Sequence, residues 1–337
     1  MKNLLVTGGT GFFGRALLRY LNSEESKKQG HFFNQITILS RSPQRFQQKF
    51  PELAQLPWIS WHEGDVLRPD SLPKRMRYHS ILHAAADITD SGDMTPLQVF
   101  RQLVDGTENM LNFAVGCGAK RFLLTSSGGV YGPQPPSISA IPETQFTSVD
   151  ALNPSNAYSI GKCQAEHLCV LFRAHYGIEA VICRCFSFVG TDLPRNTHFA
   201  IGNFIRDALD RPEIVIHGDG SPLRSYMHQS DLAQWLLTLL QHGTPGGAYN
   251  VGSDEVYSIL QVAHLVRDIL APQKVVVVKD ASTQFTSASN RYVPDITKAQ
   301  SEFDLKITIR LSEAVQLLKT HFDPLSSALN TRQLIAG

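Results

Sequence analysis

The chain has 337 residues, 42% of them hydrophobic, so it can bury a large core and is long enough for two lobes. Its 31 lysine and arginine residues nearly balance its 30 aspartate and glutamate residues, and the charges are interleaved without basic runs. Neither nucleic acid nor a membrane surface is therefore an expected partner. A small molecule is the expected ligand.

The sequence shows no targeting or metal-binding pattern. Its first residues form too short an apolar run for a signal peptide, and no stretch of about 18 apolar residues follows, so we predict a cytoplasmic protein. The five cysteines lack the Cys-x2-Cys spacing of zinc and redox sites. The histidines form no His-x3-His pair, so no metal is expected.

The chain begins with a short apolar strand, residues 3–7, that runs directly into a glycine-rich turn and a helical pattern. Gly8 suits a tight turn, Gly11 lets the backbone approach a diphosphate, and Gly14 lets helix and strand pack closely. The N–H groups at the helix start, at Phe12 and Phe13, would face the same diphosphate. We predict a dinucleotide-binding turn here, with a purely structural glycine turn as the alternative.

Short β-branched runs alternate with amphipathic helices through the first half of the chain, which predicts an α/β fold with a doubly wound parallel sheet of the Rossmann type. The expected strands lie near residues 3–7, 36–40, 58–61, 80–83, 121–126 and 179–184. After Gly190 the elements become shorter. There we expect a strand over 214–217 and helices near 199–210, 231–241, 258–270 and 311–321.

The shift to shorter elements after Gly190 predicts two domains. A Rossmann dinucleotide-binding domain would span residues 1–190, with a later return near 228–252. A smaller, discontinuous α/β substrate lobe would span residues 191–330.

The strand ends of the first domain supply further candidate cofactor contacts, because ligands of open α/β sheets bind at the carboxyl ends of the strands. The second strand ends in Ser40 and Arg41 instead of an acidic residue. A guanidinium suits a 2′-phosphate, so NADP is slightly favoured over NAD, with a solvated arginine as the alternative. The next two strand ends contribute Asp65, Val66, Ala84, Ala85 and Ala86.

The fifth strand ends in two serines followed by two glycines, Ser126-Ser127-Gly128-Gly129. Small side chains at the carboxyl end of a strand indicate that a ligand approaches the backbone closely there. Downstream, Tyr158 and Lys162 are four residues apart and therefore share one helical face. A nearby ammonium stabilises a phenolate, so the pair can act as an acid/base with Ser127 around a nicotinamide. A surface pair on an amphipathic helix is the alternative.

These motifs resemble the extended short-chain dehydrogenase/reductases, specifically the nucleotide-sugar epimerase/dehydratase family. The resemblance covers nearly the whole chain. It rests on Gly8-x2-Gly11-x2-Gly14, Ser126-Ser127-x2-Val130-Tyr131-Gly132, Asn153-Pro154-x3-Tyr158-x3-Lys162, Arg184-Cys185-Phe186-Ser187-Phe188-Val189-Gly190, Gly218-Asp219-Gly220-Ser221-x2-Arg224-Ser225-Tyr226 and Pro294-Asp295-Ile296-x-Lys298-Ala299.

The resemblance implies roles for these residues. Tyr158 would be the acid/base at a sugar hydroxyl, Lys162 would hold the nicotinamide ribose and tune the tyrosine, and Ser127 would hydrogen-bond the reacting oxygen. Hydride would pass between the nicotinamide and a ring carbon, usually C4. The implied contacts to a nucleotide sugar are Ser126, Ser187, Asn203, Arg224 and Arg291, with surface cations as the alternative for the two arginines.

Four positions depart from the family pattern. Ser187 stands where many relatives have Asn, Leu103 where a cofactor-facing Asn is frequent, and Arg41 where NAD enzymes have an acid. Gly128-Gly129 replaces the Asp-Glu pair of sugar 4,6-dehydratases, and related decarboxylases keep a Glu there. Since elimination needs a carboxylate base and acid, dehydration and decarboxylation are disfavoured.

The chemistry that remains is hydride transfer with Tyr158 as the acid/base. It favours a nucleoside-diphosphate-sugar epimerase acting at C4, with an NADPH-dependent NDP-4-keto-sugar reductase as the main alternative. A non-enzymatic NADP(H) sensor is less favoured, because such a protein would be expected to lose Tyr158 and Lys162. The helix at 97–115 and the Tyr158 helix are unusually apolar. Helices of this kind are buried or paired with another chain, and the resemblance implies a homodimer through them.

Overall fold

A computed structural model describes residues 3–28, 30, 33–74, 76–86, 94–197, 199–279 and 290–323. Seven strands form one parallel sheet in the order β11-β6-β5-β4-β1-β2-β3. Their bounds are β1 Asn3–Thr7, β2 Gln35–Ser40, β3 Ile59–Glu63, β4 Ser80–His83, β5 Arg121–Ser127, β6 Glu179–Cys185 and β11 Ala248–Val251. The doubly wound α/β class is confirmed, and the six predicted strands are present within two residues at each end.

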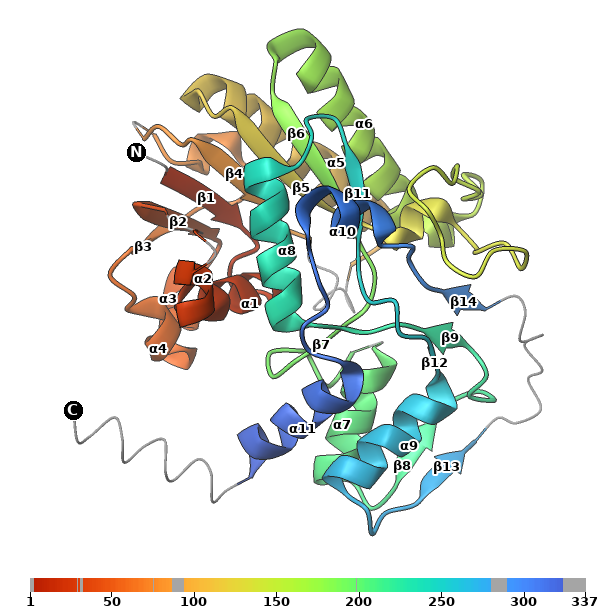
Figure 1. Cartoon of the computed structure of the whole chain (residues 1–337). Helices are drawn as coiled ribbons and strands as arrows, with labels where there is room; N and C mark the ends of the chain where they lie inside the picture. The colour runs from red at the N-terminus through yellow and green to blue at the C-terminus, as the bar shows by residue number, and fades with distance from the viewer. Residues whose placement is uncertain are drawn as a thin grey trace, which may run out of the picture.

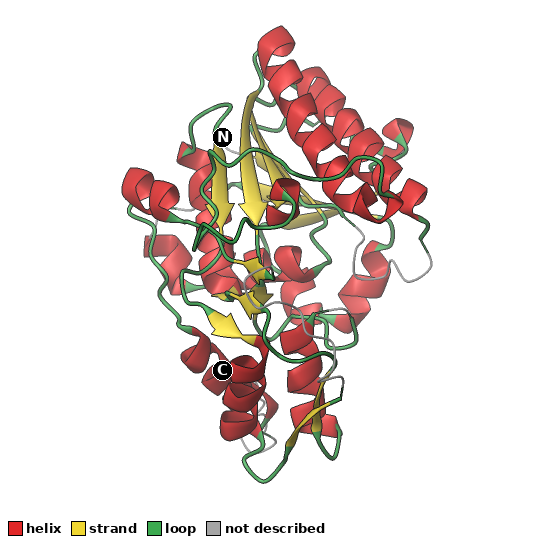
Figure 2. Cartoon of the chain, turned by 90° about the vertical axis from the view of Figure 1, so that its right-hand side faces the viewer, coloured by secondary structure: helices red, strands yellow, loops and turns green. Residues whose placement is uncertain are grey.

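Helices cover both faces of this sheet (Figure 1; Figure 2). One face packs against α1 (Phe12–Leu21) and α8 (Gln229–His242), and the other packs against α5 (Pro96–Cys117) and α6 (Ala157–Tyr176). Shorter helices near the β2–β3 edge are α2 Glu24–Lys28, α3 Pro43–Lys49 and α4 Pro51–Ala54. The result is a three-layer domain in which the strands are buried on both faces, as parallel sheets require.

The long helix α5 shows how local sequence fixes an element. Thr95 accepts a hydrogen bond from the Gln98 backbone N–H at 3.3 Å, and the Gln98 side chain accepts one from the Thr95 N–H at 2.8 Å. This capping box is followed by Pro96 in the first helical turn, where a missing N–H costs nothing. At the other end Gly118 adopts a φ of 76°, the left-handed conformation that ends many helices.

The second lobe lies below the carboxyl ends of the sheet strands in Figure 1 and has its own apolar core. Its helices are α7 Ala200–Asp210, α9 Ile259–Leu270 and α11 Leu311–Phe322, and β8 Ile214–Ile216 pairs with β13 Val276–Val278. A small sheet has the order β12-β9-β14, with bounds Tyr257–Ser258, Leu223–Arg224 and Arg291–Tyr292, and β7 Phe188–Val189 pairs with β10 Met227–His228. The predicted helices and the strand over 214–217 are confirmed.

The chain crosses between the two lobes more than once. After the first elements of the second lobe, α8 and β11 return to the main sheet, where β11 pairs with β6, and α10 (Thr297–Phe303) reaches β11 through a Lys298 Nζ bond of 2.8 Å to the Ala248 carbonyl. This arrangement supports a return near 228–252. The full division into 1–190 and 191–330 stays a prediction.

Within the described ranges, no helix has the length and apolar character needed to cross a membrane. The same residues contain no group of three or more His, Cys, Asp or Glu side chains placed to hold a metal ion.

The α8 core yields a stability prediction. Leu236, a residue of α8, is fully buried against the sheet, whereas Leu317 on α11 is 43% exposed. We expect Leu236→Ala to lower the free energy of unfolding by about 3 kcal/mol, because a truncated core leucine loses burial and leaves a cavity. The matched variant Leu317→Ala should cost under about 1 kcal/mol. Urea denaturation measures both, and equal losses would contradict the assignment of α8 to the core.

Candidate functional site

The glycine turn after β1 is built for a close approach. Gly8 has a φ of 71°, and an added Cβ would lie 2.4 Å from the Ala84 carbonyl oxygen. A Cβ on Gly14 would lie 2.2 Å from the Gly9 backbone, while one on Gly11 would meet nothing nearer than the Gly8 oxygen at 3.4 Å. Gly8 and Gly14 are therefore required by packing, and the backbone at Gly11 stays open to a ligand.

The start of α1 can hold an anion. Gly11 is its N-cap residue, and no side chain caps the helix among the described residues, so the first N–H groups lack helical partners. The rings of Phe12 and Phe13 lie 6.3 and 5.2 Å from that of Phe188, so these residues would serve a ligand through their backbone. An uncapped helix start behind a glycine turn fits the diphosphate of a nicotinamide dinucleotide.

The other predicted cofactor residues gather along the same edge of the sheet. Ala84 and Ala85 bond back to Thr7 through their N–H groups, both at 3.2 Å, which places the β4 end beside Gly8. The Asp65 carboxylate accepts from the Leu67 N–H at 2.9 Å, and Val66 is buried. Of the remaining members, Ser40 ends β2, Arg41 directly follows it and is exposed, and Ala86 is the third residue after β4.

His83, at the end of β4, is a buried titratable group beneath this edge. Its ring nitrogens lie 2.7 Å from Thr7 Oγ1 and 3.3 Å from Thr107 Oγ1. Burial lowers the pKa of His83 to about 3, with a smaller contribution from Lys162. A neutral imidazole held between two hydroxyls has a structural role here.

The predicted catalytic residues lie together. Ser127 ends β5 and Tyr158 lies in the first turn of α6, and Ser127 lies close enough to lower the pKa of Tyr158 against the larger effect of burial. Lys162 lies one turn further along α6, where its Nζ is 5.9 Å from the Tyr158 ring centroid and donates to the Thr125 carbonyl at 2.7 Å. The helix spacing and the strand end therefore converge as the sequence predicted.

Burial shifts the protonation of this group in opposite directions. It raises the pKa of Tyr158 to about 12, against a smaller lowering by the Ser127 hydrogen bond. It lowers the pKa of Lys162 to about 8, opposed by the side chains of Cys185 and Glu166. At neutral pH the phenol is therefore protonated and the ammonium carries its charge.

Ser126 points to a second, buried network. Its hydroxyl donates to Glu166 Oε1 at 2.5 Å, and Arg184 binds the same carboxylate with Nη2–Oε2 at 2.7 Å and Nε–Oε1 at 3.0 Å. Neighbouring strand residues face opposite sides, so Ser126 turns away from Ser127. This geometry favours a structural role for the predicted substrate contact at Ser126. The sequence signal for Glu166 was its place four residues after Lys162.

The predicted substrate contacts of the second lobe are already engaged by protein groups. Arg224 donates to the Leu223 and Asn290 carbonyls at 2.8 and 3.0 Å and to Asn290 Oδ1 at 2.9 Å. Asn203 donates to the Thr197 carbonyl at 2.9 Å. Arg291 Nη1 donates to the Ser139 carbonyl at 3.1 Å.

Two further positions complete this comparison. Ser187 is partly buried, and its carbonyl accepts from the Met227 N–H at 3.0 Å. Tyr292, which sequence reasoning missed, lies close enough to Ser127 from the second lobe for the serine to lower its pKa. The two-residue strand that carries Tyr292 gave no local signal for this contact.

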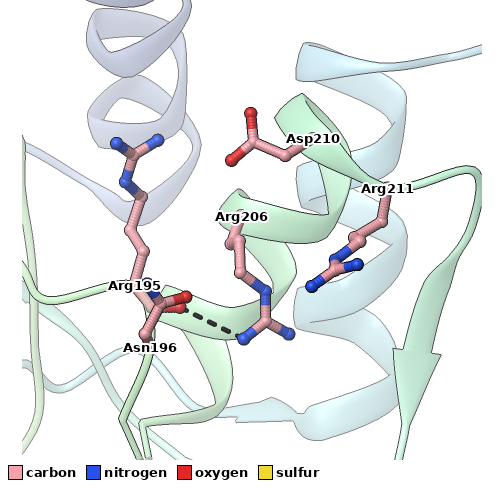
Figure 3. A pocket seen from close by; sticks show the side chains of 5 residues that line it. All are labelled: Arg195, Asn196, Arg206, Asp210 and Arg211. Carbon is pink, nitrogen blue, oxygen red and sulfur yellow. Dashed lines mark hydrogen bonds between the residues drawn. The ribbon is translucent and has the colours of Figure 1, made fainter.

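The described cavities lie outside the catalytic group. One of about 260 Å³ in the second lobe is lined by Arg195, Asn196, Arg206, Asp210 and Arg211 (Figure 3). Arg206 is paired there with Asp207 at 2.7 Å. Another of about 270 Å³ includes Arg291, Ser139 and Asp295 in its lining. The Arg291 guanidinium therefore lies at a different surface from Tyr292.

Comparisons with known proteins agree with this geometry. The family model described as "NAD dependent epimerase/dehydratase family" matches residues 4–252. UDP-glucuronic acid decarboxylase 1 of Arabidopsis thaliana is 26% identical over 319 residues, which cover 95% of this chain and 69% of the decarboxylase.

Two solved structures share the fold over almost their whole length. The UDP-glucose 4-epimerase of Thermotoga maritima, solved with UDP-glucose, has a TM-score of 0.78 at 21% identity and covers 95% of this chain and 98% of its own. RMD from Pseudomonas aeruginosa, complexed with NADPH, has a TM-score of 0.73 at 22% identity with the same coverage. These structures show the shared fold, and the matched family model shows that the chain belongs to the NAD-dependent epimerase/dehydratase family and is a nicotinamide-dependent enzyme.

Proposed function

We propose that the protein is a nucleoside-diphosphate-sugar epimerase that acts at C4 of an NDP-hexose through a 4-keto intermediate. The observation that carries this proposal is that Ser127, Tyr158 and Lys162 lie together at the carboxyl end of β5. The two residues that follow this strand are glycines. Such a group can move a proton at one sugar oxygen, and it offers no carboxylate for elimination.

In this mechanism Tyr158 takes the proton of the sugar hydroxyl and later returns it, while Ser127 hydrogen-bonds the same oxygen. Lys162, whose Nζ lies 5.9 Å from the Tyr158 ring centroid, would stabilise the phenolate through its charge. Hydride transfer to and from the sugar carbon would be supplied by a bound nicotinamide, whose oxidised form would also carry a positive charge. The residues of the glycine turn and of the ends of β2, β3 and β4 would hold it.

Dehydration and decarboxylation fit this site less well, although a UDP-glucuronic acid decarboxylase is among the relatives. Both positions that would carry the acidic pair are glycines, Gly128 and Gly129. The nearby carboxylate of Glu166 is occupied by Arg184 and Ser126. Both of its oxygens already accept hydrogen bonds from these two groups, so neither is open to a substrate proton.

The second candidate is an NADPH-dependent NDP-4-keto-sugar reductase, favoured by Arg41 at the end of β2. A guanidinium at this place suits the 2′-phosphate of NADP, and RMD, a structural neighbour, is complexed with NADPH. We therefore propose NADP as the preferred cofactor, with NAD as the alternative. A sensor role without turnover is less favoured because the chain keeps Tyr158 and Lys162. The cytoplasmic location stays a prediction.

We also propose a homodimer through α5 and α6. These two helices pack side by side over one face of the sheet (Figure 2). Several of their apolar side chains remain exposed, among them Leu97 at 60%, Val170 at 48% and Leu171 at 40%. A second copy of the same helix pair would cover these side chains in a four-helix arrangement.

The experiment that tests the function mixes the protein with UDP-, dTDP-, CDP- and GDP-sugars and follows the NADPH absorbance and the sugar products. An epimerase converts an ordinary NDP-hexose to its C4 epimer without added reductant. Net loss of NADPH with a 4-keto sugar, and no epimer formation, would replace the epimerase with the reductase.

Removing the phenol hydroxyl of Tyr158 tests the acid/base assignment. We expect Tyr158→Phe to lower kcat by at least about a hundredfold, because general acid–base catalysis contributes factors of this size. Tyr176→Phe is the matched control, since Tyr176 ends the same helix and is 60% exposed. Steady-state turnover of the sugar measures both, and a Tyr158→Phe variant as fast as the wild type would exclude Tyr158 as the acid/base.

The lowered pKa of Lys162 predicts a pH-dependent stability. Its pKa is about 8 in the folded protein and 10.5 when unperturbed, so between these values the unfolded chain binds the additional proton and the wild type gains stability as pH rises. Lys162→Met should lack this gain, which is on the order of 3 kcal/mol.

Urea denaturation near neutral pH and near the upper end of this window checks the expectation. Lys319→Met, which removes an exposed lysine of α11, should keep the wild-type pH dependence. Parallel curves for wild type and Lys162→Met would show that the ammonium is not desolvated.

Removing the guanidinium after β2 tests the cofactor preference. We expect Arg41→Ala to weaken NADPH binding by about tenfold and to leave NADH binding within about twofold, since only the 2′-phosphate loses its charged partner. Calorimetric titration with each dinucleotide measures the effect. Arg211→Ala, in the second lobe, is the control. An equal loss for both dinucleotides would show that Arg41 does not read the 2′-phosphate.

A further inference from the structure

We propose that Tyr292 is a positioning residue of the catalytic site, supplied by the second lobe. Its phenol lies where a side chain of residue 128 would lie, and it directs the Ser127 hydroxyl toward the reacting oxygen of the substrate. This role rests on the proposed function, in which Ser127 contacts the sugar.

The strand β14 delivers Tyr292 to the site. It pairs with β9 in parallel, with Tyr292 beside Arg224 in the register. Neighbouring residues of a strand face opposite sides, so Arg291 turns to the Ser139 carbonyl while Tyr292 turns to the carboxyl end of β5. The second lobe thus places a phenol beside a hydroxyl of the main sheet.

Contacts at both the hydroxyl and the ring hold the Tyr292 side chain. Its hydroxyl donates to the Cys185 carbonyl oxygen over 3.5 Å, and Ser127 lies close enough to lower its pKa against the larger effect of burial. Its ring packs on Phe186 with centroids 4.6 Å apart and planes tilted by 34°. The Arg224 guanidinium, held by Asn290, lies 6.0 Å from the ring centroid. These contacts restrict the movement of the ring away from the site.

The phenol of Tyr292 explains why residue 128 is a glycine. A Cβ added to Gly128 would lie 2.6 Å from Tyr292 Oη and 2.7 Å from Phe186 Cζ. Gly128 is not among the glycines of positive φ in the described chain, so its backbone conformation would accept other residues. The space taken by the two rings is what excludes a side chain at this position.

The hydrogen-bond capacity of Ser127 gives the phenol a function. A serine hydroxyl has one donor hydrogen and two acceptor lone pairs. The Gly129 N–H donates to Ser127 Oγ at 3.0 Å. Burial raises the pKa of Tyr292, so its phenol keeps its one hydrogen. The Cys185 carbonyl accepts that hydrogen only over 3.5 Å, at the long limit for a hydrogen bond, so in the proposed arrangement the hydrogen turns to the second lone pair of Ser127. The single hydrogen of Ser127 is then left for Tyr158 or for the substrate oxygen.

A double-mutant cycle on turnover tests this role. With the NDP-sugar that the wild type converts best, Tyr292→Phe should lower kcat about tenfold and leave KM within about twofold. Tyr257→Phe, which changes a tyrosine of β12 in the same small sheet, should match the wild type. In a Ser127→Ala background the same change at Tyr292 should have no further effect. An unchanged kcat, or an equal loss in both backgrounds, overturns the proposal.

A second cycle needs no substrate. Gly128→Ala should lower the melting temperature of the holoenzyme, and in a Tyr292→Phe background this loss should shrink, because the nearest clashing atom is gone. An equal loss in both backgrounds overturns the placement of the phenol. If the wild type turns over no nucleotide sugar, the proposed function fails and this cycle alone decides the placement. If it does turn over and Tyr292→Phe is neutral, only the role of Tyr292 fails.

Discussion

The buried ammonium of Lys162 is the constraint on which the catalytic site depends. A cation with 4% of its surface exposed is costly unless it is hydrogen-bonded and near opposite charge. Its bond of 2.7 Å to the Thr125 carbonyl ties α6 to the last residues of β5, which is the segment that carries Ser127. Tyr158 lies one turn before Lys162 on the same helix, so this bond also holds the start of α6 near the end of β5.

A buried polar network extends this constraint to the second lobe. Glu166, one turn beyond Lys162, is bound by Arg184, whose Nη1 donates to the Tyr131 hydroxyl at 3.0 Å. Tyr131 donates to Asn250 Oδ1 at 2.7 Å, and Asn250 donates to the Asp295 carbonyl at 2.9 Å. Because unpaired members of such a network would be expensive, its bonds keep β5, α6, β6 and the segment around Asp295 in one arrangement.

What the sequence could predict follows from how local each signal is. Gly8, Gly11 and Gly14 lie within one turn, and Tyr158 and Lys162 lie on one helical face, so spacing alone placed them correctly. Six strands of the doubly wound sheet also follow from alternating patterns, whereas β11 was expected only as part of a return of the chain near 228–252. Tyr292 was missed and Ser126 was expected at the substrate, because which face of β14 and β5 meets the site depends on pairing between distant segments. No local pattern in a two-residue strand carries that information.

Gly128 and Gly129, which follow β5, can now be interpreted through packing as well as through chemistry. Taken alone, Gly128 and Gly129 indicate only that the acidic pair of a dehydratase is missing. In the folded chain the room left at Gly128 is filled by Tyr292 and Phe186, so an acidic side chain could not be restored there without moving both rings. A phenol from the second lobe and a carboxylate at position 128 would therefore compete for one space. Under the proposed function, the absence of an acidic side chain at this position is a matter of packing as much as of acidity.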